Sequence, residues 1–354
     1  MTPAGAGAAR LLHGLRRVPA LTFCLLLLPF AACTRGEPPM TTMAPKSDLA
    51  EWTHRLYLQV IGWDTLILAI VVIAAALALW RYSTRSLGKE ESPPPPRREH
   101  LGLEVAWTVG PALVLLAIAV PTISTTFRSQ PATAPADALE VKVMAHQWWW
   151  ELRYPSLGIV TANEMHLPVE RPVRILLDSA DVIHSFWVPQ LGGKRDVIPG
   201  HTNSITLVAH TPGVYLGQCG EFCGLSHANM RFRVFVETPE EFDAWSVRQS
   251  APPPTPGRPV GTATAVEAGA RLYATSACVT CHAITGVSTQ RVGPDLTHFG
   301  SRTTLAGALL ENTPQNLALW LRDPAAVKPG AQMPELGLAH EQVTELVAYL
   351  ESLK

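Results

Sequence analysis

Charged side chains are scarce in this chain, and neither sign is in clear excess. Asp, Glu, Lys and Arg make up 16% of the 354 residues, and the formal net charge is −1. Binding to nucleic acid needs a basic patch or stripe, so this balance excludes nucleic acid as a partner. Hydrophobic residues account for 47%, which favours a membrane protein, and the length allows two or three domains.

The sequence has no cysteine pair left for a structural disulfide. Of its six cysteines, Cys24 and Cys33 lie in an N-terminal leader, and the other four form motifs at 219–223 and 278–282. Soft sulfur ligands together with imidazole select copper, zinc or iron–sulfur clusters over hard cations. Two such motifs on one chain indicate two redox centres, and therefore electron transfer rather than hydrolysis.

Residues 1–33 are typical of a secretory signal peptide. Three arginines precede the apolar run Leu21–Ala32, and small residues lead into Cys33. The triplet that ends at Cys33 is also similar to a lipoprotein box, in which this cysteine is lipidated after cleavage. Ordinary cleavage near the same place is the alternative. Either event exports the chain to an oxidising compartment.

Two further apolar runs, Thr65–Trp80 and Val105–Pro121, are each near the length needed to cross about 30 Å of hydrocarbon. Buried core helices are the alternative. Runs with so little charge favour membrane-spanning helices, which we expect at about 56–81 and 102–123.

The segment 81–100 between these runs carries five basic and three acidic residues. Cytoplasmic loops have an excess of Lys and Arg, so this segment is predicted to lie in the cytoplasm. The leader places the mature N-terminus outside. The two arguments agree on a transmembrane hairpin at 34–129 in the bacterial plasma membrane, with membrane lipid around it and all later residues on the periplasmic, extracytoplasmic side.

Residues 130–249 are predicted to form an all-β domain of the sandwich or barrel type. Short, β-branched and partly alternating segments are separated by turn residues such as Pro199-Gly200 and Pro212-Gly213. The clearest strands are Leu139–Met144, Val173–Leu177, Asn203–Val208 and Arg231–Val236. A Pro-rich linker at 250–262 follows this domain.

Residues 263–354 are predicted to form a small all-α domain. A helix is expected at Ala265–Ala274, and Thr313 with Pro314 is typical of a cap and first-turn proline ahead of another helix. The chain ends in an apolar stripe at helical spacing, made of Val343, Leu346, Val347, Leu350 and Leu353.

The segment Gln218–Met230 gathers two thiols, an imidazole and a thioether: Cys219, Cys223, His227 and Met230. Two cysteines four apart can direct both sulfurs into one loop, where two thiolates can bridge a pair of copper ions. His184 supplies a second imidazole, and the methionine a weak axial ligand that tunes copper sites. A disulfide between the two cysteines would leave His227 and Met230 unexplained. A zinc site, the other alternative, has no use for a thioether.

This loop resembles the CuA-binding loop of cytochrome c oxidase subunit II, C-x-E-x-C-G-x-x-H-x-x-M. Asp181–Pro189 and Gly193–Gly200 are similar to the family's first-histidine strand and its K-R-D-x-x-P-G segment, so the resemblance spans 50–240. It implies a cupredoxin-like domain on a two-helix transmembrane hairpin. The ligands that it implies, with Glu221 acting through its carbonyl, are His184, Cys219, Glu221, Cys223, His227 and Met230. It also implies a magnesium ion at the carboxylate of Glu221.

Two further residues have roles that the resemblance implies. Ala145–Glu151 resembles the family's aromatic segment, in which the tryptophan matching Trp148 is where electrons enter; a packed aromatic cluster is the alternative. Trp149 departs from the family pattern, which has tyrosine or phenylalanine there. Glu104 matches a glutamate where protons enter a channel, and an ionisable residue in a spanning helix is a functional hypothesis. A carboxylate that reaches the membrane interface is the alternative.

Cys278-Val-Thr-Cys281-His282 matches the attachment sequence of c-type haem. The two thiols add to the haem vinyl groups, and His282 becomes the proximal ligand. A zinc knuckle or a thioredoxin-like site is the alternative, but the adjoining histidine and the exported location disfavour both.

The sixth haem ligand is expected to be Met333, since no other methionine follows residue 230. His298 and His340 are the competing ligands. The segment around Met333 and the run Val292–Leu296 resemble class I cytochromes c, and His/Met ligation raises the redox potential as an electron acceptor requires.

Together these features predict subunit II of a haem–copper cytochrome c oxidase with a fused C-terminal class I cytochrome c domain, the caa type. Electrons would pass from a soluble or membrane-bound cytochrome c through haem c and CuA to subunit I of the oxidase complex, where oxygen becomes water and protons are translocated. No catalytic residue is expected in this chain. The alternatives are the CuA subunit of a haem–copper nitric oxide reductase and a membrane-tethered carrier without a fixed complex. A quinol oxidase subunit is disfavoured because the copper ligands are all present.

Overall fold

The computed structural model describes residues 38–83, 100–131, 133–253 and 264–354. The predicted signal peptide, Cys33, most of the predicted cytoplasmic loop and most of the Pro-rich linker lie outside these described residues. Thr42–Lys354 form one compact unit.

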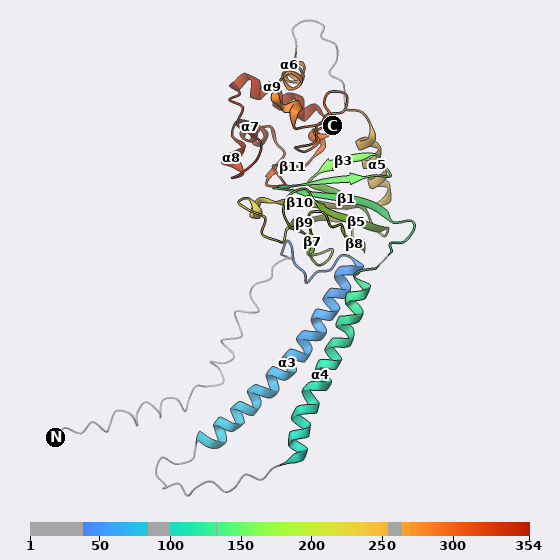
Figure 1. Ribbon diagram of the computed structural model, residues 1–354, viewed down its shortest axis with the longest axis vertical. Helices are drawn as coiled ribbons and strands as arrows, with labels where there is room; N and C mark the ends of the chain where they lie inside the picture. Colours follow the sequence, from blue (N-terminus) through green and yellow to red (C-terminus); the bar gives the residue numbers. More distant parts are fainter. Residues whose placement is uncertain (1–37, 84–99, 132, 254–263) are drawn as a thin grey trace, which may run out of the picture. The chain divides into compact units, whose positions relative to one another are not determined.

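Two long helices, α3 (Asp48–Ser83) and α4 (Leu101–Arg128), lie side by side in Figure 1. Both are long and apolar enough to cross a membrane by length and composition. The helix expected at about 56–81 begins earlier, at Asp48. Its first turn is anchored to the β domain, because the Asp48 carboxylate accepts a 2.8 Å hydrogen bond from the Val208 N–H and Leu49 joins that domain's core.

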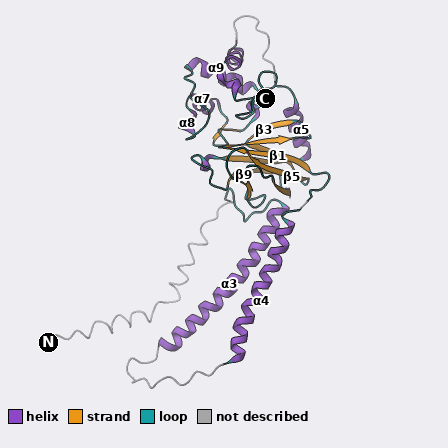
Figure 2. Cartoon of the chain, viewed as in Figure 1, coloured by secondary structure: helices purple, strands orange, loops and turns teal. Residues whose placement is uncertain are grey.

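The β domain, here called the sandwich domain (139–250), consists of two five-stranded sheets, drawn in orange in Figure 2. The sheet orders are β3-β2-β1-β5-β8 and β4-β10-β9-β6-β7. The pairs β1–β5 and β4–β10 are parallel, and the other pairs are antiparallel. The strands are β1 (Leu139–His146), β2 (Trp149–Tyr154), β3 (Ile159–Ala162), β4 (Glu164–Pro168), β5 (Pro172–Ser179), β6 (His184–Trp187), β7 (Arg195–Val197), β8 (Asn203–Val208), β9 (Gly213–Cys219) and β10 (Arg231–Glu237).

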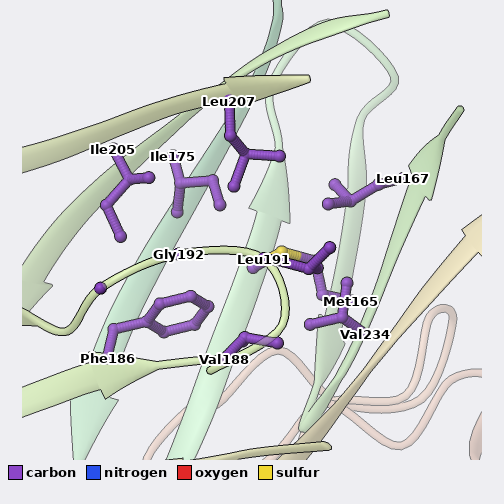
Figure 3. A pocket seen from close by; sticks show the side chains of 11 residues that line it. Met165, Leu167, Ile175, Phe186, Val188, Leu191, Gly192, Ile205, Leu207 and Val234 are labelled. Carbon is purple, nitrogen blue, oxygen red and sulfur yellow. The ribbon is translucent and has the colours of Figure 1, made fainter. Parts of the chain in front are cut away.

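The core of the sandwich domain lies between its two sheets. Alternate residues of β5 are buried, as expected for a strand with one face on the core. Figure 3 shows Ile175 and Leu207 from one sheet and Phe186 and Val234 from the other around a common apolar cavity. A Cβ on Gly192 would lie 2.8 Å from a methyl carbon of Leu49, so this glycine admits the first turn of α3.

All four strands expected in this domain are confirmed as β1, β5, β8 and β10, each within about two residues at its ends. Helix α5 (Pro239–Ser250) was not expected. It begins at a capping box formed by Thr238 and Glu241, and it buries only Phe242 and Trp245, too few apolar residues for a clear helical period.

The last part of the chain, here called the helical domain (264–354), is mainly helical, as predicted. Thr313 caps α7 by accepting a hydrogen bond from the Asn316 N–H, and the C-terminal apolar stripe lies on α9. A Cβ on Gly269 would lie 2.0 Å from the Glu345 carbonyl oxygen, so this glycine lets α6 and α9 pack closely. The elements are α6 (Ala265–Thr275), η4 (Ala277–Thr280), η5 (Phe299–Ser301), β11 (Thr304–Leu305), β12 (Leu310–Glu311), α7 (Pro314–Arg322), α8 (Pro324–Val327) and α9 (His340–Ser352).

Candidate metal centres

The predicted copper ligands converge at one end of the sandwich domain. His184 begins β6, Cys219 ends β9, and the following loop carries the other ligands. Cys219 Sγ lies 3.8 Å from His184 Nδ1 and 3.7 Å from Cys223 Sγ. Cys223 Sγ lies 3.5 Å from His227 Nδ1 and 3.8 Å from Met230 Sδ. Five soft or borderline donor atoms therefore form one continuous chain of contacts.

The disulfide alternative does not match this geometry. Both cysteines are free and buried, and their sulfurs are 3.7 Å apart, far beyond the ~2.05 Å of a disulfide bond. Two thiols, two imidazoles and a thioether in one shell also exceed the closed four-ligand set of structural zinc, and they match the preference of copper for sulfur and imidazole.

One thiol of the pair is much more acidic than the other. The hydrogen bond from Cys223, with a further one from His184, lowers the pKa of Cys219 to about 3. The same pairing, together with burial, raises the pKa of Cys223 above the ordinary thiol value. Since a metal binds the thiolate, Cys219 is prepared as the first anionic ligand, and Cys223 must release a proton when metal binds.

Asp181 orients His184, a role that the sequence did not reveal. Its Oδ1 lies 2.7 Å from His184 Nε2, and its Oδ2 accepts a 2.6 Å hydrogen bond from the Gln147 N–H. A carboxylate on one ring nitrogen fixes the tautomer and turns the other nitrogen to the metal, here Nδ1 towards Cys219. Although burial opposes it, hydrogen bonding to Cys219 and Asp181 raises the pKa of His184.

Glu221 contributes through its backbone. Its carbonyl oxygen lies 3.1 Å from Cys219 Sγ, while its side chain is exposed. The magnesium prediction gains no support: within the described residues, His184, Cys219 and Cys223 form the one group of at least three metal-type side chains.

In the helical domain, Cys278, Cys281, His282 and Met333 line a common cavity. His282 Nδ1 donates to the Pro294 carbonyl oxygen at 2.7 Å, so Nε2 is left to bind a metal. A Cβ on Gly293 would lie 2.5 Å from the ring of His282, so only glycine allows this approach. Two thiols, an imidazole and a thioether around an apolar cavity fit a covalently attached haem.

The competing ligands for the sixth position lie elsewhere. His340 Nδ1 accepts a 2.9 Å hydrogen bond from Arg322. His298 is 6% exposed, and neither it nor His340 is among the residues that line the cavity. Met333 is therefore the candidate that the fold brings to the haem cavity.

Trp148 touches both candidate centres. Its Nε1 donates a 3.0 Å hydrogen bond to the carbonyl oxygen of Cys223, and its indole also lines the haem cavity. A Cβ on Gly330, in the loop that carries Met333, would lie 2.8 Å from the indole ring. The ring therefore lies against the copper loop on one side and against the methionine loop on the other.

Glu104 lies in the first turn of α4, and its side chain is exposed. The structure does not bring it near either centre, so its role in proton uptake stays a prediction.

Comparison with known proteins extends over all three parts of the chain. The family "Cytochrome C oxidase subunit II, transmembrane domain" matches residues 43–125, and "Cytochrome C oxidase subunit II, periplasmic domain" matches 157–237. The family "Cytochrome c" matches 266–354. These ranges coincide with the two long helices, most of the sandwich domain and the helical domain.

Individual relatives match along nearly the whole chain. The chain is 37% identical over 350 residues to cytochrome c oxidase subunit 2 of Alkalihalophilus pseudofirmus, covering 94% of this chain and 96% of that protein. It is 35% identical, with the same coverage, to cytochrome c oxidase subunit 2 of Bacillus sp. strain PS3. Among solved structures, the periplasmic domain of subunit II of cytochrome oxidase of Bradyrhizobium japonicum is 32% identical over 33% of this chain and 96% of that chain, with a TM-score of 0.32.

Proposed function

Because this chain belongs to the cytochrome c oxidase subunit II family and carries a cytochrome c domain, we propose a specific electron route through it. Electrons pass from a cytochrome c donor through a covalently bound haem c and a binuclear CuA centre to subunit I. There oxygen is reduced to water with proton translocation. The chain is a membrane-anchored oxidoreductase subunit with extracytoplasmic domains, and we propose that it crosses the membrane twice.

Copper and haem supply reversible one-electron oxidation and reduction when bound. The sandwich domain would hold the copper pair through His184, Cys219, Cys223, His227 and Met230, with the carbonyl of Glu221. The helical domain would hold the haem through the thiols of Cys278 and Cys281 and through His282 and Met333 as iron ligands. His184, Cys219, Cys223 and Met230 are buried, and a copper site shielded from water suits rapid electron transfer.

The chain's own residues prepare these sites. Asp181 holds the ring of His184 with Nδ1 towards the thiols, and the Pro294 carbonyl does the same for His282 with Nε2 towards the cavity. The hydrogen bond between the two thiols lowers the pKa of Cys219 and raises the pKa of Cys223.

One observation carries the proposal: Trp148 contacts both metal-binding loops of the same chain. An aromatic side chain in van der Waals contact with both loops provides a short, continuous path between the two centres. Trp148 matches the tryptophan through which electrons enter subunit II in this family. Here electrons would reach it from the chain's own haem domain.

Optical and EPR spectra of the purified full chain test both centres at once. We expect the multiline EPR signal of a mixed-valence copper pair beside the optical spectrum of a low-spin haem c. Zinc in place of copper in elemental analysis would contradict the copper assignment. Purification tests the partner: a stoichiometric large polytopic subunit supports the oxidase, and a lone chain supports the tethered carrier.

A further inference from the structure

The contact between the sandwich domain and the helical domain contains two buried charged side chains, one from each side. Neither belongs to a metal-binding motif. All four donors to the Glu164 carboxylate lie across the boundary between the domains, and Lys328 makes one of its two hydrogen bonds there.

Glu164, at the start of β4, is 3% exposed. Its carboxylate accepts hydrogen bonds from the Thr303 N–H at 2.9 Å and the Thr304 N–H at 2.8 Å. It also accepts one from each of the two hydroxyls at 2.7 Å. Hydrogen bonds to a charged group are about twice as strong as neutral ones, and a buried carboxylate is costly unless it is satisfied. The helical domain supplies all four of these donors.

Lys328 forms the reciprocal contact from the helical domain. It is 4% exposed, and its Nζ donates to the Trp148 carbonyl oxygen at 2.6 Å and to the Ala306 carbonyl oxygen at 2.9 Å. Burial lowers the pKa of Lys328 to about 7. One of its two hydrogen bonds holds the backbone of Trp148, the residue that lies between the two centres.

The loop beside Lys328 has a strained backbone where it makes this contact. Ala306, Gly307 and Ala308 have φ values of +56°, +76° and +56°. The left-handed region costs roughly 1–2 kcal/mol for each residue other than glycine. A Cβ on Gly307 would lie 2.5 Å from Lys328 Nζ and 3.1 Å from the Trp148 carbonyl oxygen. The Gly307 carbonyl in turn accepts a 3.2 Å hydrogen bond from the Arg231 N–H of the sandwich domain.

We propose that Glu164 and Lys328 latch the helical domain onto the sandwich domain in one orientation, which holds Trp148 against both metal-binding loops. The haem-bearing domain is then a docked electron donor and does not swing freely on its linker. In the docked orientation it covers Trp148, so an external donor delivers its electron to the helical domain. The purpose of the latch rests on the proposed electron route, but its existence does not.

Amide hydrogen exchange in the full-length, cofactor-loaded chain in detergent tests the latch. We expect the Thr303 and Thr304 N–H groups to be protected in the native chain. In Glu164→Gln the exchange at these two amides should accelerate at least about tenfold, because charge-assisted bonds are lost. Amides of α7 and α9 should not change. Glu140→Gln is the matched control, since Glu140 lies on β1 and pairs with Lys142.

Lys328→Met is the second variant, with Lys142→Met, which removes an exposed ammonium, as its control. Intramolecular electron transfer from haem to copper should be independent of solvent viscosity in the native chain. It should become slower and viscosity-dependent in Lys328→Met, because the domain must first dock by diffusion. Haem and copper spectra of each variant establish that both domains remain folded.

Two results would overturn the latch: unprotected Thr303 and Thr304 amides in the native chain, or unchanged exchange and unchanged viscosity dependence in both variants. These results do not depend on whether the proposed electron route is correct. Missing copper or haem signals would remove the route and leave the exchange result standing.

Discussion

All the proposed copper ligands come from the sandwich domain, whereas the haem cavity is walled by two domains. The copper donors lie on one loop and two adjoining strands, β6 and β9. The haem cavity is lined by the helical domain and also by Gln147, Trp148, Trp149 and Asn163 of the sandwich domain. The copper centre is therefore a local construction that one domain can make alone. The surroundings of the haem depend on how two domains meet.

The largest expected effects come from substituting a metal ligand in one domain, which tests whether the other domain's centre forms independently. Cys219→Ser should abolish the copper EPR signal and leave the haem spectrum unchanged, because neither copper thiol is among the residues that line the haem cavity. Cys278→Ser is the reciprocal variant, and it should abolish normal haem attachment while the copper signal persists. Loss of the copper signal in the Cys278 variant would contradict the independence of the copper domain.

The next effect concerns the haem alone. Met333→Ala should remove the sulfur-to-iron charge-transfer band, because Met333 is the thioether that lines the cavity. Met144→Ala, on β1 of the sandwich domain, is the control and should keep the band. If the band persists in Met333→Ala, the ligand assignment is wrong.

Two glycine variants test whether the helical domain and the sandwich domain can be destabilised separately. In Gly269→Ala the new Cβ meets the Glu345 backbone at 2.0 Å, and backbone cannot move aside, so we expect a loss of about 3 kcal/mol from the helical domain. In Gly217→Ala the Cβ meets the ring of Phe232 at 2.3 Å, which should cost the sandwich domain roughly 1–3 kcal/mol.

Differential scanning calorimetry of the full chain measures both glycine variants. Gly269→Ala should lower the transition of the helical domain more than that of the sandwich domain, and Gly217→Ala should do the opposite. Equal shifts of both transitions in either variant would mean that the two domains unfold as one unit.

The smallest effect is expected from Glu104→Ala. This residue is remote from both centres, so both spectra should remain unchanged while oxygen-reducing turnover of the assembled complex falls in part. Unchanged turnover would discard the role of Glu104 in proton uptake.

Much of the copper site could be predicted from the sequence because its ligands are local. Five of the six fall within residues 219–230, and the strand that carries His184 has a recognisable pattern. The strands with alternating buried residues, such as β5, were equally clear. The strands β2, β3, β4, β7 and β9 were not predicted; β3, β4 and β7 have only three to five residues, too few to show an alternating period. Helix α5 was missed because it buries only Phe242 and Trp245.

The contacts between the domains could not be predicted. Glu164 and Thr303 are separated by 139 residues, and Lys328 and Trp148 by 180. Apart from Trp148, none of these residues belongs to a motif, and their partners are defined only when two folded surfaces meet. The contact of Asp181 with His184 leaves more trace in the sequence, because Asp181 lies only three residues before His184. A carboxylate near a ligand histidine is a common second partner of metal sites.

The order in which the two centres are reduced tests the central claim most directly. Stopped-flow mixing of the full, oxidised chain with a reduced cytochrome c should show the haem reduced first. Copper should follow at a rate that is independent of donor concentration. Direct reduction of copper ahead of the haem, at a rate proportional to donor concentration, would contradict the route through the chain's own haem.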